Sequence, residues 1–204
     1  MIRNVLFDMG QVLLTFDRRL FLDRLNITEE EKQLLLREVF LSVEWVQMDR
    51  GTKNESTALE AMRTRLPEHL HGAAEELVCR WDEPVLEVEG MYELVEELKN
   101  AGYGIYLLSN ASIRQHEYWP KLPVSHLFDG KVISADHGFI KPQPEIYEIC
   151  LNIFGLKAEE CLFIDDVPGN IEGALCRGIA GIVFHGDVQL LRRQLKAAGI
   201  SVKE

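Results

Sequence analysis

The sequence predicts an α/β fold built on a doubly wound parallel sheet. Five short apolar runs are spread along the chain, and amphipathic helical patterns separate most of them. Apolar runs of this kind are typical of strands that are buried on both faces, as in parallel sheets. An alternation of strand and helix implies parallel strands, because each helix returns the chain to the start of the next strand.

The first predicted strand lies close to the N-terminus and ends in a carboxylate. Residues 5–13 read Val-Leu-Phe-Asp-Met-Gly-Gln-Val-Leu, so Asp8 ends the apolar run and Gly10 follows in a turn. Open α/β sheets bind their ligands at the carboxyl ends of the strands, and we expect Asp8 to emerge there. Taken alone, Asp8 is a nucleophile, a metal ligand or a turn cap, and the turn cap is favoured.

The other predicted strands lie in the second half of the chain and alternate with helices. The expected strands are residues 104–108, 131–134, 161–164 and 181–184. The expected helices are residues 91–101, 144–155, 168–178 and 188–198. Two of these helices open on a proline, and the first three are followed or ended by a glycine, which are favoured residues at those positions.

The stretch between the first two strands is too long for a simple crossover. A crossover takes about 30 residues, and roughly three times that number separates Asp8 from Ser109. The surplus shows helical periodicity, and a capping-box pattern at residues 28–31 predicts a long helix through Met48. We therefore predict a helical cap of about four helices at residues 17–82, inserted into a core formed by residues 1–16 and 83–204.

Composition and charge exclude several classes of function. The net charge of −11 leaves no basic face for nucleic acid, and no apolar run is long enough to cross a membrane. The first strand begins almost at Met1, which leaves no room for a secretory signal. The four cysteines form no Cys-x-x-Cys pair, and cysteines and histidines lack zinc-ligand spacing. We expect a cytoplasmic protein with reduced thiols.

Polar residues follow the predicted strands at four places along the same edge of the sheet. In chain order they are Asp8–Gly10, Ser109-Asn110, Lys141 and Asp165-Asp166. A helix cap or a surface lysine would explain some of them. The adjacent acids Asp165 and Asp166 are harder to explain structurally, because two like charges after a buried strand repel each other unless a cation or hydrogen bonds compensate.

These four motifs, in this order, resemble those of the haloacid dehalogenase-like hydrolase superfamily. The resemblance covers nearly the whole chain and implies a Rossmann-like core. The single cap resembles subfamily IA, and residues 7–13 resemble its variant-3 branch, which includes bacterial sugar-1-phosphate (glucose-1-phosphate) phosphatases. Similarity to that branch extends to Trp45, Arg50 and Gly51 in the cap.

The resemblance implies a nucleophile and a metal site, and the chemistry of the residues agrees. Asp8 would attack phosphorus and form an aspartyl-phosphate. A carboxylate and a phosphate dianion repel each other, so a cation must lie between them. One oxygen of Asp8, the backbone carbonyl of Gly10, and Asp165 and Asp166 would bind Mg²⁺, which prefers oxygen ligands.

The remaining motif residues would bind the phosphate. Lys141 would neutralise charge on the phosphate and on Asp8. Ser109 and the backbone amides around Gly10 and Asn110 would donate hydrogen bonds to the transferring oxygens. Asn170 either orients the acidic pair or simply starts a helix.

Gly10 departs from the pattern of most phosphatases in the superfamily. They carry at this position a second aspartate, which protonates the leaving alkoxide and later deprotonates the attacking water. Such a general acid–base group typically increases the rate of the reaction by a factor of about 10²–10⁴. A phosphatase could do without it if a cap residue or a water supplies the proton, or if the leaving group needs little help. The anomeric hydroxyl of a sugar 1-phosphate is such a leaving group.

Two other functions stay open. A 2-haloacid dehalogenase also lacks the second aspartate, because halide needs no proton, but it does not need Mg²⁺, so the intact Asp165-Asp166 pair favours the phosphatase. A catalytically silent binding protein is disfavoured, because nucleophile, lysine and acid pair are all retained.

The substrate itself is not readable from the cap. The aromatic residues Trp45, Tyr118 and Trp119 could stack on a sugar, although large aromatics are more often core. Four arginines could meet an anion, although solvated surface charge is the usual role: Arg18, Arg19, Arg24 and Arg50. We expect a small phosphate ester as substrate, with sugar 1-phosphates preferred over 6-phosphates.

Overall fold

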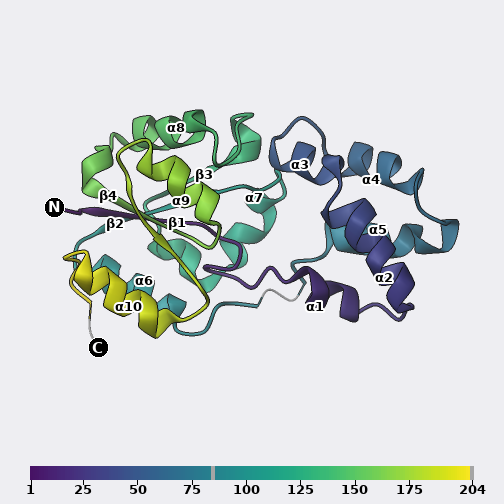
Figure 1. The fold of residues 1–204 in the computed structure, drawn as a ribbon, viewed down its shortest axis with the longest axis horizontal. Coiled ribbons are helices and arrows are strands. Elements are labelled where there is room, and N and C mark those ends of the chain that lie inside the picture. The colour runs from purple at the N-terminus through teal and green to yellow at the C-terminus, as the bar shows by residue number, and fades with distance from the viewer. Residues whose placement is uncertain (84–85, 203–204) are drawn as a thin grey trace.

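A five-stranded parallel sheet forms the centre of the computed structural model, which describes residues 1–83 and 86–202 (Figure 1). The strands are β1 (Asn4–Phe7), β2 (Gly104–Ser109), β3 (Gly130–Ile133), β4 (Cys161–Asp165) and β5 (Ala180–Val183). They lie in the order β3-β2-β1-β4-β5, so the order reverses at β1. Such a reversal opens a crevice at the carboxyl ends of the strands. The predicted doubly wound parallel sheet is confirmed.

Helices cover both faces of the sheet (Figure 1). One face packs against α6 (Met91–Asn100) and α10 (Val188–Ala197), and the other against α8 (Pro144–Phe154) and α9 (Pro168–Leu175). In β1, Val5 and Phe7 point into the first of these two cores and Leu6 points into the second. Burial on both faces explains why the strand sequence is continuously apolar.

Short elements connect these layers. Helix α7 (Gln115–Tyr118) follows β2. Single 3₁₀ turns lie at Glu68–Leu70, Trp119–Lys121, Pro123–Leu127, Ser134–Asp136 and Ala158–Glu160. Within the described residues, no helix is long and apolar enough to cross a membrane.

The long connection between β1 and β2 forms a separate helical layer, here called the helical insertion. It contains α1 (Arg18–Asp23), α2 (Glu29–Leu35), α3 (Val43–Asp49), α4 (Glu55–Arg63) and α5 (His71–Cys79). These helices share an apolar core of their own, which includes Phe21, Leu35, Met62, Leu70 and Leu77. The insertion lies beyond the carboxyl ends of the strands, on the right in Figure 1. It therefore faces the edge at which the polar motifs were expected.

The expected single helix from Thr28 to Met48 is wrong, because the chain breaks in its middle. The capping box is present: Thr28 N donates to Glu31 Oε2 at 2.8 Å. However, α2 ends at Leu35, a π-helical turn follows at Leu36–Phe40, and α3 begins after Ser42. The Ser42 hydroxyl accepts a hydrogen bond from the Trp45 backbone, which makes it the N-cap of a new helix.

Candidate active site

The strand register brings the polar motifs together. Phe7 of β1 pairs with Ile164 of β4, and Asp8 N donates to the Ile164 carbonyl at 2.8 Å. Asp8 and Asp165 therefore lie next to each other at the carboxyl ends of neighbouring strands. Lys141 joins them: its Nζ lies 2.7 Å from Asp8 Oδ1 and 2.7 Å from Asp165 Oδ2.

Lys141 is fixed in place from several sides. Its Nζ donates to the Leu108 carbonyl at 2.9 Å. Its backbone N donates to Asn110 Oδ1 at 2.7 Å, and Asn110 Nδ2 donates to the Lys141 carbonyl at 3.0 Å. The Asn110 side chain thus clamps the loop that carries the lysine against the end of β2. The Lys141 side chain is only 1% exposed, so its ammonium is directed at the carboxylates and not at solvent.

Three carboxylates gather at this edge and form a candidate cation site. Asp8, Asp165 and Asp166 each offer an oxygen, and these oxygens lie within 4.8 Å of one another. The cluster offers only oxygen ligands, which is the donor set that Mg²⁺ prefers. One ammonium, that of Lys141, cannot balance three carboxylates. The residues therefore fit a divalent cation, and the chemistry of the site calls for one.

Asn170 contacts the acidic pair directly. From the first turns of α9, its Nδ2 lies 3.0 Å from both carboxylate oxygens of Asp165. The Val167 backbone N donates to Asp165 Oδ1 at 2.8 Å. These donors fix the orientation of Asp165, which is fully buried.

The electrostatics of the site follow from burial and from close charges. Burial, and secondarily Asp165, raise the pKa of Asp8 although Lys141 opposes them. Burial also raises the pKa of Asp166, and the Asp165 charge adds to this effect. For Lys141, burial lowers the pKa but the charges of Asp8 and Asp165 outweigh it, so its pKa is raised. Lys141 is therefore a permanent cation in this site.

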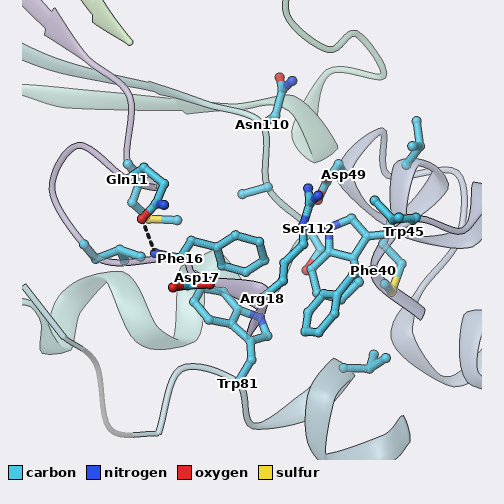
Figure 2. Close-up of a pocket in the computed structure, with 18 of the residues that line it drawn as sticks. Gln11, Phe16, Asp17, Arg18, Phe40, Trp45, Asp49, Trp81, Asn110 and Ser112 are labelled. Carbon is cyan, nitrogen blue, oxygen red and sulfur yellow. Dashed lines mark hydrogen bonds between the residues drawn. The ribbon is translucent and has the colours of Figure 1, made fainter. Parts of the chain in front are cut away.

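Two predicted phosphate-binding residues lie in different environments. Gly10 lines a cavity in front of Asp8, at the start of a tight turn in which the next residue, Gln11, has a φ of 58°. The Gln11 side chain closes this turn by accepting a hydrogen bond from Phe16 N at 3.0 Å (Figure 2). Ser109 is 1% exposed and is not among the described residues that line the cavity, whereas Asn110 is.

The cavity has a volume of about 830 Å³ and extends from Asp8 to the helical insertion. Aromatic side chains form much of its wall, and Figure 2 shows several of them around one space. They are Phe16, Phe40, Trp45, Trp81 and Tyr118. The ring centroids of Phe16 and Trp81 are 4.8 Å apart, and those of Phe40 and Trp45 are 5.0 Å apart.

The aromatic residues considered from the sequence divide between cavity and core. Trp45 and Tyr118 line the cavity, whereas Trp119 packs against Phe128 in the core of the sheet. Sequence reasoning missed Phe16, Phe40 and Trp81.

The four arginines considered from the sequence also lie in different environments, some in the cavity wall and some outside it. Arg18 lines the cavity, and Arg19 lines it while pairing with Asp23 and Glu29. Arg24 Nη1 is 3.5 Å from the carbonyl of Glu83.

Arg50 joins the insertion to the loops around the sheet. Its Nη1 donates to Gln143 Oε1 at 2.8 Å and to the Gly138 carbonyl at 3.2 Å. The next residue, Gly51, has a φ of 75°, and a Cβ there would lie 2.1 Å from the Ala135 carbonyl oxygen. Only glycine permits this approach.

Asp49 is a further cavity residue that sequence reasoning missed. It is the last residue of α3 and directly precedes Arg50. Its backbone carbonyl accepts a hydrogen bond from the Ser134 hydroxyl. The signal available in the sequence was the position of this carboxylate. It directly precedes Arg50 and Gly51, two cap residues that the sequence analysis had already singled out.

Known proteins with similar sequences and structures are hydrolases. A family model for haloacid dehalogenase-like hydrolases matches residues 2–176. A flavin mononucleotide hydrolase of Arabidopsis thaliana is 30% identical over 115 residues, which cover 56% of this chain but only 46% of that protein. A sesquiterpene phosphatase of Aspergillus oryzae is 28% identical over 189 residues, with 88% of each chain covered.

The fold is shared with solved structures of the same family. A HAD family enzyme from Bacteroides thetaiotaomicron, solved in complex with magnesium and inorganic phosphate, is 23% identical and gives a TM-score of 0.69. The match covers 94% of this chain and 99% of that one.

Proposed function

The chain belongs to the haloacid dehalogenase-like hydrolase family, and within it we propose a Mg²⁺-dependent phosphatase that hydrolyses a small phosphorylated metabolite through an aspartyl-phosphate. One observation carries this proposal: Asp8, Lys141 and the Asp165-Asp166 pair meet at the point where the strand order reverses. Nucleophile, charge-neutralising lysine and an all-oxygen cation site are the groups that phosphoryl transfer needs.

Each residue of the site has a role in the proposed reaction. Asp8 Oδ attacks phosphorus while the ester bond breaks, and water then attacks the same phosphorus and releases inorganic phosphate. Lys141 stabilises negative charge on the phosphoryl group, and the backbone amides near Gly10 and Asn110 donate to its oxygens. We propose Ser109 as a further donor, which requires its hydroxyl to turn from its buried position beside the cavity toward the phosphoryl group. Mg²⁺, held by Asp8, Asp165, Asp166 and the Gly10 carbonyl, would neutralise the phosphate as a Lewis acid.

The acidic cluster favours the phosphatase over a 2-haloacid dehalogenase. Displacement of halide needs no cation, whereas Asp166 adds a third carboxylate to a site with one lysine. Turnover should therefore need Mg²⁺ and stop in chelator. Full turnover of a 2-haloacid in chelator would support the dehalogenase.

A silent binding protein makes a different prediction. Beryllium fluoride with Mg²⁺ mimics the phosphoryl group on an aspartate, so it should raise the melting temperature of the wild type and not that of Asp8→Asn. A wild type that does not respond, and turns over no phosphate ester, would support the silent protein.

Two substrate classes deserve a direct comparison. Sugar phosphates, with the 1-phosphate above the 6-phosphate, are proposed on the resemblance of residues 7–13 and on the leaving-group argument for Gly10. The second class is phosphate esters of apolar or flat aromatic groups, favoured by the aromatic cavity wall. A panel of glucose 1-phosphate, glucose 6-phosphate, flavin mononucleotide and an isoprenyl phosphate, with Asp8→Asn as control, separates them by kcat/KM.

The remaining proposals concern the domain organisation, the cellular location and the class of substrate. We propose that residues 17–82 act as a cap domain over a core of residues 1–16 and 83–204 and contribute the substrate specificity. We also propose a cytoplasmic location, which agrees with four cysteines that form no disulfide. The net charge of −11 supports a small-molecule substrate over a nucleic acid.

A further inference from the structure

Gly10 leaves the proposed reaction without a proton donor beside the nucleophile. Five acidic residues line the cavity: Asp8, Asp17, Asp49, Glu55 and Asp166. Asp8 and Asp166 belong to the carboxylate cluster. A proton for the leaving oxygen must therefore come from water or from one of the other three acids.

Two of these three acids are occupied by local hydrogen bonds. Asp17 caps α1, and its Oδ1 accepts from Arg19 N at 2.8 Å. Glu55 Oε1 accepts from the Ser112 hydroxyl at 2.7 Å. The Asp49 carboxylate, by contrast, forms no hydrogen bond or ion pair with any residue in the described part of the chain, and so it is available to a ligand.

The position of Asp49 is set by the sheet layer as well as by its own helix. The Ser134 hydroxyl binds its carbonyl, Arg50 binds Gln143, and Gly51 lies against Ala135. The end of α3 is thereby fixed at the cavity wall. Figure 2 shows Asp49 on this wall, close to the aromatic rings and to the end of the extended Arg18 side chain.

The local environment favours the protonated form of this carboxyl. Burial raises the pKa of Asp49 to about 7; the Arg18 charge opposes the increase and the Asp8 charge adds to it. The charged and titratable groups that surround it are Arg18 of α1, Glu55 of α4, Asp8 after β1, Lys141 before α8 and Tyr118 of α7. An acid of this kind is suited to proton transfer in both directions near neutral pH.

We propose that Asp49 is the general acid and base of the reaction and replaces the side chain that Gly10 lacks. As Asp8 Oδ bonds to phosphorus and the ester bond breaks, the Asp49 carboxyl gives its proton to the leaving oxygen. The resulting carboxylate then takes a proton from the water that attacks the aspartyl-phosphate, which restores both aspartates and releases inorganic phosphate. This inference rests on the proposed phosphatase function.

The test compares two substrates of similar size that differ in their need for a proton. The p-nitrophenolate of p-nitrophenyl phosphate leaves without an acid, whereas the alkoxide of 2-phenylethyl phosphate does not. Asp49→Asn should lower the rate of the first turnover, measured as release of the alcohol with enzyme in excess, by about 10²–10⁴ for the alkyl ester and by less than ~10-fold for the nitrophenyl ester. Steady-state kcat should fall for both esters, because hydrolysis of the aspartyl-phosphate is common to both and loses its base. Glu55→Gln removes a carboxylate from the same wall, and any loss it causes should be equal for the two esters.

Two further readouts separate proton transfer from a structural role. In the wild type, kcat for the alkyl ester should fall as the pH rises above about 7, because the acid loses its proton, and this limb should vanish in Asp49→Asn. The variant should bind inorganic vanadate, with Mg²⁺, within a few-fold of the wild-type Kd.

Each outcome bears on one claim. A wild type that hydrolyses neither ester contradicts the proposed function. A wild type that hydrolyses both, with an Asp49→Asn variant that binds vanadate and loses the same factor in the first turnover of both esters, contradicts the role of Asp49 and leaves the proposed phosphatase function intact.

Discussion

The two walls of the cavity differ in almost every physical property. The sheet edge is charged and hydrogen-bonded: Lys141 alone contacts Asp8, Asp165 and the Leu108 carbonyl. The opposite wall, from the helical insertion, is more apolar, with the rings of Phe40 and Trp45 among aliphatic side chains. The first arrangement suits one reaction and tolerates little change. The second, Asp49 apart, suits recognition of an organic group and can vary without altering the chemistry.

The largest expected effect comes from the charged wall. Asp8→Asn keeps the shape and the hydrogen-bonding capacity of the side chain but removes the nucleophile. We expect turnover of p-nitrophenyl phosphate to fall by about 10⁴ or more, with an unchanged far-ultraviolet circular dichroism spectrum. Asp187→Asn, at the N-cap of α10 and outside the cavity, serves as the matched control. A folded Asp8→Asn enzyme that retains a tenth of wild-type turnover would contradict the assignment.

The next-largest effect involves one residue from each wall, Gly10 at the sheet edge and Asp49 in the insertion. A Cβ at Gly10 would lie 3.6 Å from Phe16 Cβ, an ordinary contact, so the backbone there accepts a Cβ without a clash. Gly10→Asp should raise hydrolysis of 2-phenylethyl phosphate at least ~10-fold in the Asp49→Asn background and change it little in the wild type. A gain of ~10²-fold in the wild type would mean that the natural enzyme lacks an acid, against the role given to Asp49.

A smaller effect is expected on the aromatic wall. Trp45→Ala should raise KM for the natural ester by about 2–12-fold, since stacking on one ring is worth about 0.5–1.5 kcal/mol. It should leave hydrolysis of acetyl phosphate, which is too small to reach the ring, within about twofold. Trp119→Phe, outside the cavity, should leave both substrates unaffected. Equal losses on the large and the small substrate for Trp45→Ala would show that this wall supports the chemistry itself.

The smallest effect on turnover is expected from a change in how the walls are held together, which acts on stability. Gly51→Ala forces a Cβ to within 2.1 Å of the Ala135 carbonyl oxygen, whereas at Gly138, with a similar φ of 79°, a Cβ meets nothing within 4 Å. Both changes strain a left-handed backbone by roughly 1 kcal/mol, and Gly51→Ala should cost up to a few kcal/mol more in free energy of unfolding. Urea denaturation of the pair measures the difference. Equal costs would show that the contact at Gly51 does not hold the insertion.

The same contrast explains what the sequence could predict. Asp8, Lys141 and the Asp165-Asp166 pair were predictable, because parallel strands place the residues that follow them at one edge. The break at Ser42 was not, because a serine inside a helical pattern becomes an N-cap only if packing favours a new direction. Asp49 and Trp81 were not, because which residues of the insertion face the cavity depends on how the two layers pack.

Rapid acid quench of the enzyme during turnover, with Mg²⁺ and a phosphate ester, tests the central claim most directly. Mass spectrometry of the peptide that contains Asp8 should show the mass of one added phosphoryl group, and Asp8→Asn should show none. Trapping should be strongest in Asp49→Asn with p-nitrophenyl phosphate, because that variant forms the intermediate but lacks the base that hydrolyses it. Sustained turnover without any phosphoryl group on Asp8 in either enzyme would contradict the account.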